Sequence, residues 1–205
     1  FGLEESLWIV ALLLVLLVIL TPWVPQTDAK RKDSANNGGF LSGFKVVRSS
    51  AYLGSLVWII ALTQLAITAI DFDFKMAIQA AYPDEIVRQG ALSDVYSIIN
   101  VLALVLGLWA GGVIQVLGLR NTLLGIPVLL GTCTLAFIIS PAYGVMMVTK
   151  IASKSMDYSI FRTAKELLYL PLSLEEKTEG KAVVDILTYR VSKGIASVVL
   201  LILAA

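Results

Sequence analysis

Residues 53–75, LGSLVWIIALTQLAITAIDFDFK, decide the fold class of this chain. Residues 53–70 contain no charged side chain, and their apolar positions are continuous rather than alternating. About 20 apolar residues cross the hydrocarbon core of a bilayer, and a helix satisfies its own backbone polar groups there. The stretch therefore predicts a transmembrane helix, and the charged residues at its end require an explanation.

The composition extends this prediction to the whole chain. Of its 205 residues 58% are hydrophobic, whereas soluble domains average about 45–50% apolar residues. The net charge of +1 gives no argument for nucleic-acid binding. With no His and a single Cys, at position 133, the sequence allows no internal disulfide and no plausible zinc or haem site. We therefore expect neither a metal nor a cofactor.

We predict an all-α, polytopic transmembrane helix bundle with about six visible spans. The chain starts with Phe1 and stops inside an apolar run, so we expect it to be part of a longer protein. The predicted spans cover about 7–24, a stretch from near 51, 95–117, 123–140, a stretch from near 142 into 155–172, and a stretch from near 180 to the end.

Basic residues in the loops predict the orientation. The loops 26–50, 118–122 and 171–181 are rich in Lys and Arg and lie on one side of the membrane if the spans are as drawn. The positive-inside rule makes that side cytoplasmic. We predict three parts, namely a span at 1–25 that closes an N-terminal bundle, a cytoplasmic linker at 26–50, and a truncated C-terminal bundle of five spans at 51–205.

Charged side chains recur at helical spacing inside the predicted spans. On a helical wheel they form one stripe in each of the second and fifth spans. Spacing also allows Asp157 to pair with Lys154, and Glu166 with Arg162. The stripes are Gln64, Thr68, Asp71 and Lys75 in the second span, Lys150, Lys154, Asp157, Phe161 and Lys165 in the fifth, and Lys181, Asp185 and Tyr189 in the sixth.

Two explanations of these charges stay open. A charge at mid-bilayer costs about 2.5–3.5 kcal/mol on insertion scales, so such residues persist where they face a bundle interior or a wet cavity. Basic residues outnumber acids in the stripes, which indicates a shared aqueous cavity for an anionic solute. Alternatively, the charges form internal ion pairs that fix helix packing, or extend to the headgroups at helix ends.

Residues 153–194, SKSMDYSIFRTAKELLYLPLSLEEKTEGKAVVDILTYRVSKG, resemble the ATP/ADP translocases of plastids and obligate intracellular bacteria. In TAIDFDFKMA, 68–77, Asp71 and Lys75 take the acidic and Lys places of a second family segment. Arg162 and Thr163 stand where the family has Asp-Pro. The matching residues of the long block are Tyr158, Ser159, Phe161, Lys165, Glu166, Tyr169, Pro171, Leu172, Gly180, Lys181, Ala182 and Asp185.

The turn GGVIQVLGLRN, 111–121, is similar to the loop between spans eight and nine of the major facilitator superfamily. Gly111, Gly118 and Arg120 share its register, while Gln115 and Val116 replace its Asp-Arg. A short Gly turn with one basic residue explains the same stretch equally well.

The resemblance implies a twelve-span, major-facilitator-like carrier of which this chain holds spans six to eleven, located in the bacterial inner membrane with 26–50 cytoplasmic. It implies antiport of ATP against ADP or related nucleotides. It makes Lys75, Lys165 and Lys181 partners of phosphate charge, and Asp71 and Glu166 gating or orienting acids.

We therefore expect a carrier that moves an anionic solute, with ATP or ADP as candidates, by alternating access through a Lys-lined cavity. The alternative is a non-transporting accessory or structural subunit of a larger membrane complex. We expect no enzyme, because no nucleophile–base pair is recognisable. The predicted partners are the solute, the bilayer and, under the alternative, a membrane complex, and not nucleic acid. The predicted solute-binding residues are Asp71, Lys75, Lys150, Lys154, Asp157, Lys165, Glu166, Lys181 and Asp185.

Overall fold

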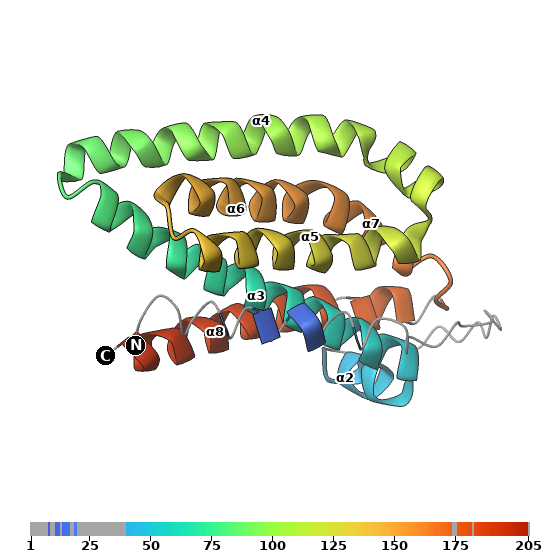
Figure 1. Cartoon of the computed structure of the whole chain (residues 1–205). Helices are drawn as coiled ribbons and strands as arrows, with labels where there is room; N and C mark the ends of the chain where they lie inside the picture. The colour runs from blue at the N-terminus through green and yellow to red at the C-terminus, as the bar shows by residue number, and fades with distance from the viewer. Residues whose placement is uncertain are drawn as a thin grey trace.

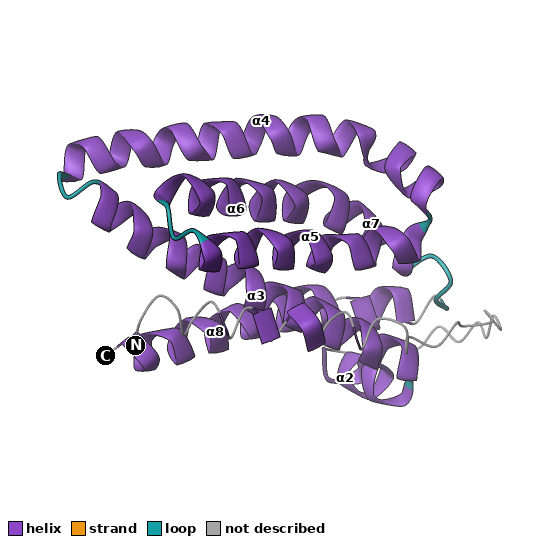
Figure 2. Ribbon diagram, viewed as in Figure 1, coloured by secondary structure: helices purple, strands orange, loops and turns teal. Residues whose placement is uncertain are grey.

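The computed structural model describes residues 40–173, 176–181 and 183–204, together with residues 8, 11, 12, 14–16 and 19 of the first apolar run. Within these residues every regular element is a helix (Figure 2). The all-α membrane-bundle prediction is therefore confirmed. Most of the predicted span at 7–24 and of the linker at 26–50 lies outside the described residues, so the three-part division stays a prediction.

The first two long helices, α3 (Ala51–Ala81) and α4 (Glu85–Leu117), are joined by a short turn and diverge from it (Figure 1). They contain 31 and 33 residues, which at 1.5 Å per residue makes each about 45–50 Å long. The predicted third span began at 95, and the helix starts earlier because Asp84 caps it. The Asp84 carboxylate accepts hydrogen bonds from the backbone N–H groups of Ile86 at 2.8 Å and Val87 at 3.1 Å.

The helix α5 (Leu119–Ile139) follows α4 after a single residue, Gly118. Gly118 has φ 78° and ψ 152°, a backbone conformation that is essentially restricted to glycine. The chain can therefore reverse here without a longer loop. The conformation gives a physical reason for glycine at this turn, whichever of the two sequence explanations applies.

The next helical path runs from Tyr143 to Leu168 and contains a π-helical segment. It consists of α6 (Tyr143–Met156), η2 (Asp157–Phe161) and α7 (Arg162–Leu168). The π segment has wider turns than an α-helix, and such segments are frequent at functional sites. The fifth predicted span thus exists as a helix, but its side chains after Met156 no longer follow a wheel of 100° per residue.

Shorter helices complete the described chain. They are α2 (Phe40–Ser49), the π-helical segments η3 (Glu176–Gly180) and η4 (Val183–Thr188), and α8 (Tyr189–Ala204). Among the described helices, α3, α4 and α5 have the length and apolar composition needed to cross a membrane. The six-span count is thus supported for these three spans, whereas the α6–η2–α7 path carries charges that lower its hydropathy.

The helix α6 lies at the centre of one half of the bundle. It packs against α3, α4 and α5, while α8 runs along α3 on the other side (Figure 1). The outward face of α4 is apolar, with Leu104, Leu108 and Trp109 exposed by 66%, 78% and 70%. Such a face suits lipid tails or further membrane helices. The bundle therefore carries its polar residues inside and much of its apolar surface outside.

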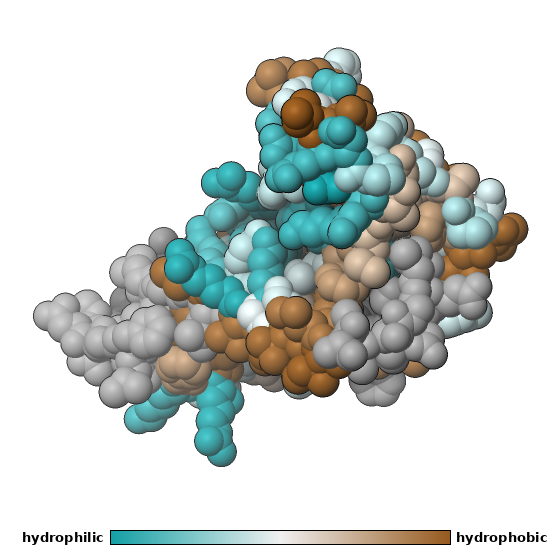
Figure 3. Space-filling view, turned by 90° about the vertical axis from the view of Figure 1, so that its left-hand side faces the viewer, coloured by the Kyte–Doolittle hydropathy of each residue, from teal (hydrophilic) through white to brown (hydrophobic). Residues whose placement is uncertain are grey.

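Hydrophilic side chains gather at the end of the bundle that carries the α3–α4 turn. Seen from that end, they fill the middle of the face, with apolar side chains above and below (Figure 3). Asp84 and Glu85 lie exposed in this turn. The first turns of α4 mix polar residues with the exposed Ile86 and Val87, so hydropathy alone places the start of this span later than the start of the helix.

Candidate functional site

The deepest charged group of the described chain is a cluster that joins α3 to α6, called here the Asp71 cluster. It consists of Asp71, Lys150 and Lys154. The Asp71 carboxylate forms ion pairs with both ammonium groups, one oxygen with Lys150 and the other with Lys154 at 2.8 Å. The Lys150 side chain is 0% exposed and that of Lys154 is 5% exposed. One carboxylate thus faces two buried cations, so the cluster carries surplus positive charge.

Aromatic rings surround the two ammonium groups. The Lys150 nitrogen lies 5.3 Å from the ring centroids of both Phe74 and Tyr96, and the Lys154 nitrogen lies 5.8 Å from that of Tyr158. Ring faces attract cations, most strongly where water is excluded. These rings stabilise the surplus charge without neutralising it.

A cavity of 370 Å³ lies further along the bundle, between α3, the η2–α7 segment and the η4–α8 segment. Its volume falls in the range of small-molecule sites. Among the described residues of its wall, Lys165 is the one lysine, beside Arg162 and three carboxylates. The described lining residues are Ile60, Gln64, Asp157, Tyr158, Phe161, Arg162, Lys165, Glu166, Asp185 and Tyr189.

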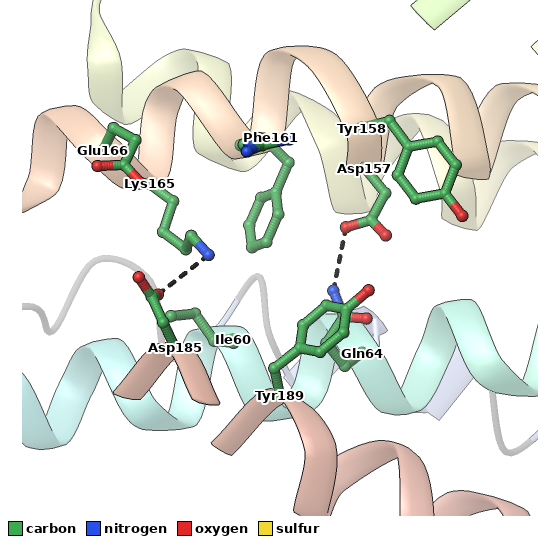
Figure 4. Close-up of a pocket in the computed structure, with 10 residues that line it drawn as sticks. Ile60, Gln64, Asp157, Tyr158, Phe161, Lys165, Glu166, Asp185 and Tyr189 are labelled. Carbon is green, nitrogen blue, oxygen red and sulfur yellow. Dashed lines mark hydrogen bonds and ion pairs between the residues drawn. The ribbon is translucent and has the colours of Figure 1, made fainter. Parts of the chain in front are cut away.

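At one side of the cavity, Gln64 of α3 meets Asp157 of η2. The Gln64 amide nitrogen donates a hydrogen bond of 3.0 Å to one Asp157 oxygen (Figure 4). Gln64 and Asp157 are 0% and 7% exposed. The other carboxylate oxygen and the amide oxygen of Gln64 are buried and have no hydrogen-bond partner among the described residues. This pair thus holds two unused acceptors at the cavity wall.

At the other side of the cavity, two ion pairs join α7 to the segment that follows it. Lys165 pairs with Asp185 at 3.0 Å, and Lys181 pairs with Glu166 at 2.6 Å. The Tyr169 hydroxyl donates a hydrogen bond of 2.9 Å to Asp185. This hydrogen bond adds a neutral contact to the Lys165–Asp185 pair.

The structure brings eight of the nine predicted solute-binding residues into these two groups. Lys150, Lys154 and Asp71 form the cluster, and the other five lie on or beside the cavity. Lys75 is exposed on α3 and forms no ion pair with a described residue. A role in solute binding stays a prediction for all nine.

Both ion pairs expected within the fifth span are replaced by pairs between helices. Lys154 contacts Asp71 of α3 and not Asp157, while Glu166 contacts Lys181 and not Arg162. A helical wheel predicts which residues share a face of one helix. It does not predict which residues of other helices lie opposite that face. The π turn at Asp157–Phe161 adds a second reason, since it changes the direction of every side chain that follows.

Sequence reasoning missed several contributors to the site. Tyr96 from α4 and Tyr169 contact the charged groups, and Tyr169 had been identified as part of the family block alone. Within the described ranges, no group of three or more His, Cys, Asp or Glu residues is placed to hold a metal ion.

Fold and site together define a class, a polytopic helical membrane protein with paired charges and a polar cavity in its interior. The family model of the TLC ATP/ADP transporter matches residues 138–205, which include α6 and everything after it. The resemblance predicted from the sequence is thereby confirmed. No solved structure matches the chain.

Rickettsial carrier proteins extend this similarity to most of the chain. ADP,ATP carrier protein 3 of Rickettsia bellii is 26% identical over 202 residues, 87% of this chain and 40% of that carrier. ADP,ATP carrier protein 3 of Rickettsia conorii is 26% identical over 92% of this chain and 42% of its own length. ADP,ATP carrier protein 5 of Rickettsia felis is 27% identical over 96% of this chain and 46% of its own.

The chain thus spans less than half the length of the curated relatives it matches. These relatives are named as carriers and not as enzymes. Together with the long apolar helices, they fit a multi-pass protein of the bacterial inner membrane.

Proposed function

We propose that this chain is part of a membrane carrier that exchanges nucleotides, ATP and ADP among them, by alternating access. The observation that carries the proposal is the Asp71 cluster, in which Lys150 and Lys154 share one carboxylate inside the bundle. Intramembrane charges are expensive and typically mark solute or ion pathways. The similarity to rickettsial ADP,ATP carriers supports a nucleotide as the solute.

Surplus positive charge in a poorly screened interior attracts phosphate groups. Each lysine supplies a point charge on a mobile stem, so it can follow a phosphate through a conformational change. Asp71 keeps the two ammonium groups from repelling each other while no anion is bound. A nucleotide phosphate that reaches the cluster supplies the additional negative charge needed to balance both ammonium groups.

The ion pairs beside the cavity supply the gating part of the proposal. The Lys165–Asp185 pair joins α7 to η4, and the Lys181–Glu166 pair joins α7 to the residue between η3 and η4. Both pairs lie on the predicted cytoplasmic side. When formed, they hold that end of the bundle together. Opening towards the cytoplasm separates these partners, and solute phosphates then take the place of the carboxylates.

The cavity also bears on the alternative of a non-transporting subunit. That alternative predicts a cavity blocked by side chains or by lipid, whereas a 370 Å³ cavity that side chains leave open lies where three charged helices converge. Its lining by residues of all three predicted stripes supports a carrier. A major-facilitator-like arrangement of the complete protein is part of the same proposal.

Uptake by reconstituted protein tests the proposal. The complete protein is placed in liposomes preloaded with ADP, and entry of labelled ATP is measured. We expect Lys154→Ala and Lys165→Ala to lower uptake at least tenfold, while Lys45→Ala, which removes an exposed lysine of α2, leaves it unchanged. Thermal unfolding of each variant confirms that it is folded. Equal uptake by folded Lys154→Ala and wild-type protein would overturn the role of the cluster.

A further inference from the structure

The wall formed by Gln64 and Asp157 offers two unused acceptors beside the second N–H of the Gln64 amide. The single hydrogen bond between them uses one amide proton and one carboxylate oxygen. The remaining oxygens, Gln64 Oε1 and Asp157 Oδ2, are buried without a hydrogen-bond partner among the described residues. Buried polar groups in native structures nearly always have partners, so an unsatisfied pair at a cavity indicates that something binds there.

Aromatic side chains lie beside these acceptors. Tyr158, Phe161 and Tyr189 line the same cavity as Gln64 and Asp157. The Phe161 ring lies between the Asp157–Gln64 pair and the Lys165–Asp185 pair (Figure 4). Aromatic faces bind planar bases by stacking regardless of base identity. This part of the cavity therefore suits a flat ring that carries hydrogen-bond donors.

The opposite part of the cavity suits an anion. Lys165 lies there with Asp185 as its partner, and Arg162 forms no ion pair with any residue that the structure describes. Lys165 follows Asp157 by two turns, roughly 12 Å along a helix at 1.5 Å per residue. The cavity thus separates the acceptor wall from an end that carries the Lys165–Asp185 ion pair.

We propose that Gln64 and Asp157 bind the exocyclic amino group of a nucleobase and so determine which bases the carrier accepts. This inference rests on the proposed transport of nucleotides and adds the recognition of the base to it. An amino group has two N–H donors, one for Gln64 Oε1 and one for Asp157 Oδ2. An oxo group at the same ring position can accept only from the second Gln64 N–H, and it leaves Asp157 Oδ2 unpaired.

The arrangement therefore favours adenine and cytosine over hypoxanthine and uracil. Sites that hydrogen-bond a substrate N–H reject analogues that lack it, because buried polar groups of the site are then left unpaired. One lost hydrogen bond to a charged group corresponds to about tenfold or more in binding. We expect at least tenfold preference for ATP over ITP, and for CTP over UTP.

Competition between matched nucleotides tests the inference in the complete, reconstituted protein. Uptake of labelled ATP, ITP, CTP and UTP is measured for wild type, Gln64→Leu, Asp157→Asn and the surface control Lys45→Ala. Gln64→Leu removes an acceptor and narrows the ATP/ITP ratio to about threefold or less. Asp157→Asn presents an N–H donor in place of one oxygen, so it narrows the ratio or inverts it. Lys45→Ala keeps the wild-type ratio.

The outcomes separate the inference from the function on which it rests. Wild-type protein that takes up no nucleotide would overturn both. Uptake of all four nucleotides at similar rates, or an ATP/ITP ratio unchanged in both folded variants, would overturn base recognition and leave nucleotide transport standing. Where a variant fails to fold, the thermal stabilisation of wild-type protein by ATP and by ITP gives the same comparison, and equal stabilisation contradicts the inference.

Discussion

Asp71→Asn tests whether the Asp71 cluster depends on its single carboxylate. Asparagine keeps the size of the side chain and removes the charge that faces Lys150 and Lys154. Both ammonium groups then stay almost fully enclosed without their ion-pair partner. Breaking a buried ion pair in this way costs about 3–5 kcal/mol. Because the Asp71 side chain is 25% exposed, we expect the lower end, about 3 kcal/mol of the free energy of unfolding.

The assay is reversible unfolding of the complete protein in mixed micelles, and the loss of helical signal measures the extent of unfolding. Asp94→Asn provides the control, since Asp94 is an exposed residue of α4 without an ion pair to a described residue. It removes the same charge and should change the free energy of unfolding by less than about 0.5 kcal/mol.

A second variant separates charge from packing. Lys150→Met removes the most buried ammonium and keeps an unbranched side chain of similar length. In the Asp71→Asn background it should recover at least half of the lost stability, because an apolar replacement of a buried ion pair is often neutral or stabilising. A loss below about 1 kcal/mol for Asp71→Asn, or no recovery in the double variant, would refute the electrostatic account of the cluster.

Three further changes test local features of the fold and site. Gly118→Ala should lower the free energy of unfolding by about 1–3 kcal/mol, because its backbone conformation is nearly exclusive to glycine. The control Gly112→Ala lies inside α4 with open space around it and should not destabilise the protein. Equal effects of the two substitutions would contradict the reasoning. Asp84→Ala should cost about 1 kcal/mol by removing the cap of α4, visible as faster amide exchange in its first turn; unchanged exchange would contradict this. Tyr169→Phe should cost about 1 kcal/mol, because it removes the hydrogen bond to Asp185; unfolding measurements check this, and no loss would mean that the bond is replaced by water.

The helices were predictable from the sequence, whereas the partners of the charges were not. Continuous apolar runs without alternation leave helices as the membrane solution, and α3 begins at Ala51 as predicted. The start of α4 was placed ten residues late, because hydropathy detects the apolar part of a helix and not its capped polar extension.

The candidate site was predictable as a set of residues but not as an arrangement. Periodicity selected Asp71, Lys150 and Lys154 because each breaks an apolar pattern, and these residues meet in the structure. A one-dimensional pattern contains no information on which helix faces which, so both expected local ion pairs were wrong. The π turn at Asp157–Phe161 has no sequence signal in hydropathy either, although it directs Asp157 towards Gln64.

The distribution of charge along α3 suggests how one interior serves two parts of a nucleotide. Asp71 and Gln64 are seven residues apart, roughly 10 Å along the helix, and each meets a different section of the α6–η2–α7 path. The contact at Asp71 contains two lysines, whereas the contact at Gln64 contains two unsatisfied acceptors. The lysines of the Asp71 cluster, of the cavity and of its rim each have a carboxylate partner on a neighbouring segment. In the proposed carrier, phosphates therefore compete with internal carboxylates for these lysines, and release of the solute is assisted because a carboxylate is available to replace it.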